Sequence, residues 1–179
     1  GNNKEFAGSM GLGLLSSRLM FEGPIVKDKA SFMVAGRRSY QDVLLKLSPN
    51  DDLNNIIANF YDLNAKVNYK FSDKSRLFLS AYYGKDAFGV PGLVGFNWGN
   101  LGLTARWNYL LSDKLFMNVS SIYSDYDYAI LFDFPQAKID NIAYIRNQAN
   151  KISFSWFPNA QHQINYGVEA TVYDFEPFS

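Results

Sequence analysis

Residues 59–71 read NFYDLNAKVNYKF, and their polarity alternates strictly along the chain. The apolar members are Tyr61, Leu63, Ala65, Val67, Tyr69 and Phe71, and the polar members between them are Asp62, Asn64, Lys66, Asn68 and Lys70. Because successive side chains of a β-strand point to opposite faces, the segment predicts a strand with one apolar and one polar face. Soluble strands usually run about five or six residues, whereas a membrane-spanning strand needs about nine to eleven. Its length favours the membrane-spanning strand.

Alternation and turn-forming residues together predict about eight antiparallel strands, connected as a meander of four hairpins. The expected strands cover residues 10–22, 30–38, 58–71, 76–84, 98–111, 115–126, 146–157 and 163–174. Within each hairpin the connection is short and polar, and Ser72-Asp73-Lys74-Ser75 is an example. Between hairpins we expect longer connections, at about 39–58, 85–97 and 127–145. This asymmetry is typical of outer-membrane barrels, which have short periplasmic turns and long extracellular loops.

An internal sequence repeat supports the hairpin as the repeating unit. NYKFSDKSRLFLSAYY at 68–83 and NYLLSDKLFMNVSSIY at 108–123 align without gaps and share Ser-Asp-Lys at the turn. In this alignment Leu77 and Leu79 correspond to Met117 and Val119. Both hairpins therefore present one apolar face in the same phase.

The phasing divides the chain into two sets of side chains. We expect the lipid-facing set to include Leu63, Val67, Tyr69, Leu77, Leu79, Leu103, Trp107, Val119, Phe154 and Trp156. The opposite, lumen-facing set includes Arg18, Glu22, Arg37, Asp62, Lys66, Lys70 and Arg106. A charge on the lipid face near the midplane costs roughly 2–4 kcal/mol, so a sheet that spans a membrane requires this separation. A half-buried soluble sheet shows the same alternation and remains an alternative.

Composition narrows the function classes. Lysine plus arginine equals aspartate plus glutamate at 17 each, so the net charge gives no sign of a nucleic-acid partner. Cysteine is absent, which excludes disulfides and thiolate chemistry. Aromatic residues make up 17% of the chain while the mean hydropathy is -0.17, a combination that suits a transmembrane barrel with polar lumen residues.

The sequence offers little for catalysis, and we predict that the protein is not an enzyme and needs no cofactor. His162, the single histidine, falls in an expected turn, and no G-x-S-x-G motif is present. The stretch Asn50-Asp51-Asp52 and the residues Asp125, Asp127 and Asp133 could supply oxygen ligands for calcium, but they lack EF-hand spacing. Solvated loops are the favoured interpretation, so we predict no metal site.

Five segments together resemble the barrel of TonB-dependent outer-membrane receptors of Bacteroidetes-type bacteria. GLGLLSSRLMFEGPIVKDKASFMVAGRRSY at 11–40 is similar to the first barrel hairpin after the plug domain. FYDLNAKVNYKFSDKSRLFLSAYYGKD at 60–86 and the WGN and RWNY motifs within 98–109 are similar to the following strands. SSIYSDYDY at 120–128 and SFSWFPNAQHQINYGVEATVYDF at 153–175 continue the resemblance.

The resemblance implies a barrel of twenty-two strands in the bacterial outer membrane that encloses a plug and imports a scarce nutrient with energy passed on by TonB. Residues 1–9 would be the end of the plug or a linker, and residues 10–179 the first eight or so strands. The partners implied are outer-membrane lipid, the rest of the barrel, the plug, and TonB indirectly through the plug. The lumen-facing set would contact the plug or, less often, the substrate, which the sequence does not identify.

Two alternatives use the same strands differently. In one, eight strands close into a small self-contained barrel with a structural or adhesive role. In the other, the apolar residues form the core of a soluble, carbohydrate-binding sandwich. The chain ends are expected to separate these interpretations: a complete barrel would begin after a cleaved signal peptide, whereas a fragment would have Gly1 inside a longer polypeptide and further strands after Pro177.

Overall fold

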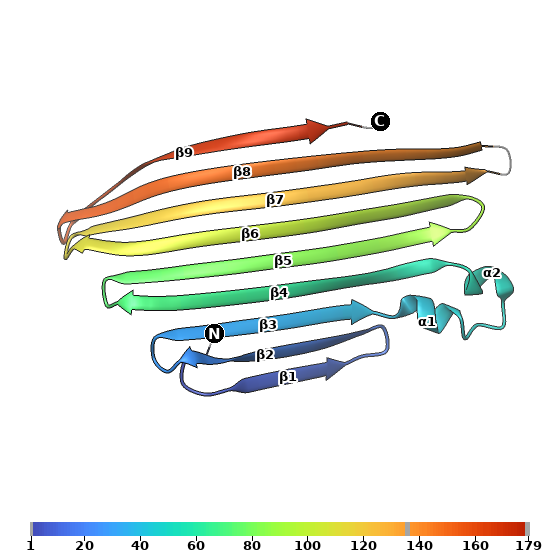
Figure 1. The fold of residues 1–179 in the computed structure, drawn as a ribbon, viewed down its shortest axis with the longest axis horizontal. Coiled ribbons are helices and arrows are strands. Elements are labelled where there is room, and N and C mark those ends of the chain that lie inside the picture. Colours follow the sequence, from blue (N-terminus) through green and yellow to red (C-terminus); the bar gives the residue numbers. More distant parts are fainter. Residues whose placement is uncertain (1, 135–136, 178–179) are drawn as a thin grey trace.

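The computed structural model is a single antiparallel sheet of nine strands in the order β1-β2-β3-β4-β5-β6-β7-β8-β9. It describes residues 2–134 and 137–177, without the side chains of 51–52, 133–134 and 137–138. Figure 1 shows the strands side by side in chain order, with the two short helices beyond one end of β3 and β4. The predicted all-β antiparallel meander is confirmed.

The described strands and helices are β1 Ala7–Leu12, β2 Ser16–Val26, β3 Ala30–Ser39, α1 Gln41–Leu45, α2 Asp51–Asn54, β4 Ile57–Ser72, β5 Ser75–Val90, β6 Val94–Ser112, β7 Leu115–Phe134, β8 Ala137–Asn159 and β9 His162–Glu176. We call the end of the sheet with the β4–β5 and β6–β7 connections the turn end, and the end with α1 and α2 the helix end (Figure 1).

The predicted first strand, 10–22, is wrong, because the chain reverses inside it. β1 ends at Leu12 and β2 begins at Ser16, with the Gly13 amide donating to the Ser16 carbonyl at 2.9 Å. The glycines that flank Leu12 lower the strand propensity there, and the adjacent pair Leu14 and Leu15 interrupts the alternation. The sheet therefore has nine strands in the described residues rather than about eight.

Two of the three long connections are also wrong. β5 continues to Val90 and β6 begins at Val94, so most of the expected loop at 85–97 is paired strand. Similarly, β7 reaches Phe134 and β8 begins at Ala137, within the loop expected at 127–145. Only the connection between β3 and β4 is long, and it holds α1 and α2.

The turns at the turn end repeat one local structure. The Lys74 amide donates to Ser72 Oγ at 3.2 Å, and the Lys114 amide donates to Ser112 Oγ at 3.4 Å. A register shift lies just before each turn, between Lys70 and Ser72 and between Leu110 and Ser112. The shared Ser-Asp-Lys sequence therefore produces the same bulged turn twice, as expected for serine and aspartate in tight turns.

The sheet is one layer thick and has almost no core of its own. Among the described residues, the buried hydrophobic side chains are Ala30 and Ala143, while large apolar side chains such as Leu63, at 53% exposure, lie open on the sheet surface. Such an exposed apolar area requires a partner, either a second protein layer or lipid. In the described part of the chain, no helix has the length and apolar character needed to cross a membrane.

Candidate functional site

The two faces of the sheet are fixed by its register. Directly paired residues of antiparallel strands share a face, and we call a set of such pairs that runs across the strands a row. One central row joins Phe32, Val67, Leu79, Ala105, Ser121, Asn150 and Ala170. Counting alternate residues from this row places every residue of the expected lipid-facing set on one face, which we call the apolar face, and the expected lumen-facing set on the other, the polar face.

The apolar residues form a band of limited height on the apolar face. On β4 the band runs from Tyr61 to Tyr69, and on β9 from Ile164 to Val172, at every second residue. Towards the helix end the same face becomes charged within one or two residues. The row just beyond Leu101 joins Arg38, Tyr61, Lys85, Gly99, Asp127, Tyr144 and Glu176, and we call it the charged row.

The band crosses the strands obliquely. Its middle residue on β4, Ala65, lies in the row of Leu103, whereas its middle residue on β9, Val168, lies in the row of Trp107. This displacement of about 13 Å along the strands accumulates over roughly 24 Å across them, at about 3.4 Å per residue and 4.8 Å per strand. The band therefore makes an angle of about 30° with the rows.

Aromatic rings mark both limits of the band. Near the helix end the rings of Tyr61 and Tyr83 lie 6.0 Å apart between centroids. At the turn end Trp107 lies 5.5 Å from Tyr109, and its indole nitrogen donates to Ser75 Oγ at 2.9 Å. Amphipathic rings with a polar atom at one end suit the boundary between apolar and polar surroundings.

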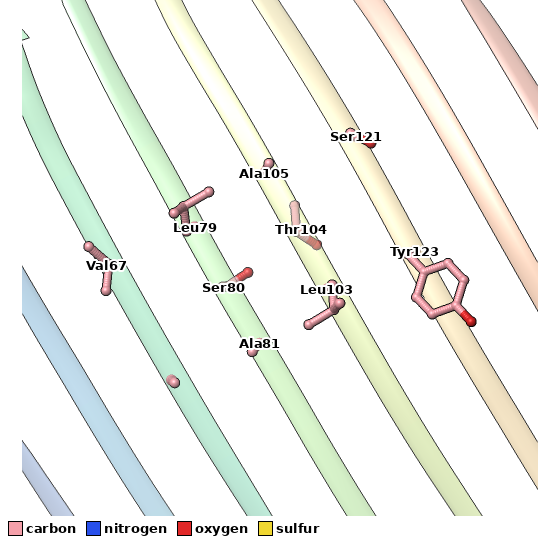
Figure 2. Close-up of a pocket in the computed structure, with 10 residues that line it drawn as sticks. Val67, Leu79, Ser80, Ala81, Leu103, Thr104, Ala105, Ser121 and Tyr123 are labelled. Carbon is pink, nitrogen blue, oxygen red and sulfur yellow. The ribbon is translucent and has the colours of Figure 1, made fainter.

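A shallow hollow of about 360 Å³ lies in the middle of the band (Figure 2). Small side chains produce it, because Ala65, Ala81, Ala105 and Ser121 separate the larger Leu79, Leu103 and Tyr123. None of these side chains carries a charge, so the hollow provides apolar contact area and no chemistry.

One ion pair lies on the apolar face, next to the charged row. Arg146 Nε donates to Asp125 Oδ2 at 3.1 Å, and Tyr123 Oη donates to the same oxygen at 3.3 Å. The Arg146 guanidinium also lies 4.5 Å above the ring centre of Tyr144. This cluster was not predicted, because the alternation of each strand does not reveal the register that sets Asp125 opposite Arg146.

On the polar face, Arg37 and Asp62 form a close pair. Arg37 Nε donates to Asp62 Oδ2 at 2.7 Å, and the guanidinium lies 4.9 Å from the ring centre of Phe60. The Asp62 side chain is only 13% exposed, so this pair is better shielded from water than the other ion pairs of the described side chains. Arg18 lies directly opposite Arg37 on β2. Glu22 Oε2 accepts a bond from the Asn2 amide at 3.2 Å.

Nearer the turn end, four cations gather on the polar face of β4, β5 and β6: Lys66, Lys70, Arg76 and Arg106. We call them the cationic patch. Lys70 lies directly opposite Arg76, and Arg106 lies opposite Phe78, two residues along β5. Arg76 was not among the predicted site residues, although its alternation with Leu77 and Leu79 signals the polar face.

Beyond the level of Asp62, the polar face becomes aromatic. Phe88 pairs with Phe96, and Trp98 pairs with Tyr128. The polarity of the two faces is therefore reversed at the helix end, where the apolar face carries the charged row. This reversal explains why the sequence there showed no continuous alternation although the backbone ladder continues.

The remaining candidates show no catalytic arrangement. His162 is exposed at the first position of β9, just after the expected turn, where its Nδ1 lies 2.8 Å from Asn159 Oδ1. The side chains of Asp51, Asp52 and Asp133 lie outside the described residues. Among the side chains that are described, no three histidine, aspartate or glutamate residues are grouped to hold a metal ion.

The chain matches no protein-family model, no curated protein and no solved structure. The two-faced sheet, the oblique apolar band and the cationic patch are thus the features from which a function can be argued.

Proposed function

We propose that this chain forms part of the wall of a β-barrel in a bacterial outer membrane, with the apolar face towards lipid and the polar face towards the lumen. The observation that carries the proposal is the oblique apolar band. In a soluble half-buried sheet the apolar face has no reason to end at one oblique level on strands as far apart as β4 and β9. A bilayer imposes such a level, because its hydrocarbon core is a slab of fixed thickness.

The angle and the height of the band fit a bilayer. Strands of outer-membrane barrels are tilted by about 35–45° from the membrane normal, close to the angle of about 30° between the band and the rows. Nine residues of strand span about 27 Å, which corresponds to about 23 Å along the normal at this tilt. Outer-membrane barrels have an apolar band about 25 Å tall.

The charges agree with the same orientation. The charged side chains of the charged row and the Arg146–Asp125 pair lie at or beyond the helix-end limit of the band, where water and lipid headgroups can solvate them. Within the height of the band, Lys66 and Arg106 lie on the opposite face, where a barrel has its aqueous interior. The lumen-facing roles of Arg18, Glu22, Arg37, Asp62 and Lys70 follow the same reasoning.

The transport role rests on the sequence resemblance. The five segments between residues 11 and 175 resemble TonB-dependent receptors, so we propose that the barrel imports a nutrient and that its plug contacts the polar face. The described sheet offers such a plug a broad surface of lysine, arginine, asparagine and serine side chains.

Tryptophan quenching in vesicles tests the membrane orientation. A variant that retains only Trp107, on the apolar face, is expected to lose most of its fluorescence when the bilayer contains brominated acyl chains. A variant that retains only Trp98, on the polar face, is the matched control and is expected to be quenched mainly by aqueous iodide. Equal quenching of both variants by brominated lipid would contradict the proposed orientation.

The mass of the native polypeptide tests the receptor assignment. We expect tryptic peptides from residues 68–83 to occur in an outer-membrane band several times heavier than the 20.3 kDa of this chain, because plug and remaining strands belong to a receptor. A gel band near 20.3 kDa in the outer-membrane fraction would contradict the receptor assignment. The proposal that the apolar face contacts lipid would still stand.

A further inference from the structure

The cationic patch has a charge excess that the sheet itself does not neutralise. Among the ion pairs of the described side chains, Lys70 contacts Asp73 in the adjoining turn, while Lys66, Arg76 and Arg106 have no acidic partner. The Lys70 ammonium donates to Asp73 and holds the pKa of that carboxyl below its usual value. Of the four cations, only Lys70 therefore has an acidic partner in these ion pairs.

The neighbouring positions on the polar face are uncharged. Between the level of Lys66 and the turn end, the other polar-face residues of β4, β5 and β6 include Asn68, Phe78, Ser80, Thr104 and Asn108. On β7, Asn118 and Ser120 continue the same rows, and on β8 Lys151 is already paired with Glu169 at 3.1 Å. In these rows the nearest other acid is Glu22, two strands away from Lys66 on β2, and the neighbouring turns carry Asp28 and Asp113, each next to a lysine in the sequence.

The placement of Lys70 opposite Arg76 puts two cations together, and the Asp73 carboxylate pairs with only one of them, Lys70. Like charges directly opposite one another on neighbouring strands destabilise a sheet. Arginine and lysine placed together with hydroxyl and amide donors are instead the usual means of binding phosphate or carboxylate groups.

A cavity of about 380 Å³ lies over this surface, lined among others by Lys66, Ser80, Thr104, Arg106 and Asn108. Its volume falls in the range of small-molecule sites, about 300–1,000 Å³. The size therefore favours a small ligand.

We propose that the cationic patch binds a small polyanion that carries two or more phosphate or carboxylate groups. The inference rests on the proposed function in one respect, namely that the polar face lines a water-filled lumen that such a solute can enter. Lys66 and Arg106, which line the cavity, contact the anion across β4 to β6, and Arg76 and Lys70 add positive potential from the turn end.

Calorimetric titration of the full chain, folded in neutral detergent at low ionic strength, tests the site. The probes are inorganic pyrophosphate for phosphate groups and tricarballylate for carboxylate groups, and whichever binds more tightly identifies the source chemistry. Lys66→Gln with Arg106→Gln is expected to weaken binding by about tenfold or more, because hydrogen bonds to charged groups contribute about 1.5–3 kcal/mol each. Lys66→Arg with Arg106→Lys, which keeps both charges, is expected to retain most of the affinity.

The matched control removes the same charge elsewhere. Lys46→Gln with Lys85→Gln changes two exposed lysines at the helix end, away from the patch, and is expected to leave the affinity within about twofold, since distant exposed charges are screened. An equal loss in this control, or no binding by the unaltered chain, would overturn the site.

If pyrophosphate binds while Trp107 escapes lipid quenching, the membrane proposal fails and the patch stands. If Trp107 is quenched while neither probe binds, the patch fails and the membrane proposal stands.

Discussion

Leu79→Arg is expected to destabilise the folded sheet in lipid vesicles by about 2–4 kcal/mol. Leu79 lies in the middle of the apolar band and is paired with Val67 and Ala105 on its two neighbours. An arginine there would place its guanidinium in hydrocarbon, beyond easy reach of either interface. Reversible urea unfolding of the vesicle-inserted protein measures the change.

Two arginine controls separate the effect of depth in the bilayer from the effect of the face of the sheet. Ala87→Arg lies on the same strand and the same face but beyond the charged row, and we expect it to cost about 0–1 kcal/mol. Asn64→Arg lies at a depth near that of Leu79 on the polar face, close to Asp62, and is expected to be similarly mild. An equal penalty at Leu79 and Ala87 would show that depth is irrelevant and would contradict the bilayer as the partner of the band.

Ala81→Pro is expected to have an effect at least as large. Ala81 is paired on both sides, with Ala65 of β4 and Leu103 of β6, so the variant loses an N–H group from a central ladder. A carbonyl without its donor in an apolar environment costs roughly 2–7 kcal/mol, and water cannot replace the donor inside a bilayer. The expected result is a failure to form the folded species that resists denaturation on an unheated gel.

Asp113→Pro provides the matched proline control. Asp113 follows Ser112 in the β6–β7 turn, and no residue of this turn has a positive φ. Proline is favoured at the second position of such turns, so this variant is expected to fold as well as the unaltered chain. If both proline variants folded equally well, the ladder at Ala81 would not be essential to the sheet.

The turn-end half of the fold could be predicted from the sequence because three signals agree there. Strict alternation in β4 predicts both faces of the sheet, and Ser-Asp-Lys predicts the turns. The sequence repeat between 68–83 and 108–123 predicts that two hairpins have their apolar residues in the same phase. Each signal is local in the sequence, which is why it is readable without a structure. The beginnings of β3, β7 and β9 fell within one residue of their expected positions.

The helix-end half could not be predicted in the same way. Near Lys85 the alternation of the two faces breaks, because Lys85 lies on the apolar face and Phe88 on the polar face, although both remain paired. Backbone hydrogen bonds do not depend on side-chain polarity. The strands therefore stay paired beyond the point where the alternation of polar and apolar residues ends. At the other edge, Gly13 creates a reversal that no alternation reveals.

For the candidate site, the sequence predicted on which face each residue lies but not which residues lie close together. Alternation assigns Lys66 and Arg106 to one face of their strands but leaves the distance between them open. The register determines that distance, because it sets Lys66 opposite Ser80 and Ser80 opposite Thr104. The pairing of Arg37 with Asp62, and that of Arg146 with Asp125, likewise required the alignment of separate strands.

The number of strands has a consequence for closure. In a meander every strand reverses the direction of the one before it, so β1 and β9, the first and last of nine, run the same way. Joining these two edges directly would create a parallel seam between a strand of 6 residues and one of 15. A closed, wholly antiparallel barrel that contains this sheet must therefore add an odd number of strands between β9 and β1, from the same polypeptide or from another.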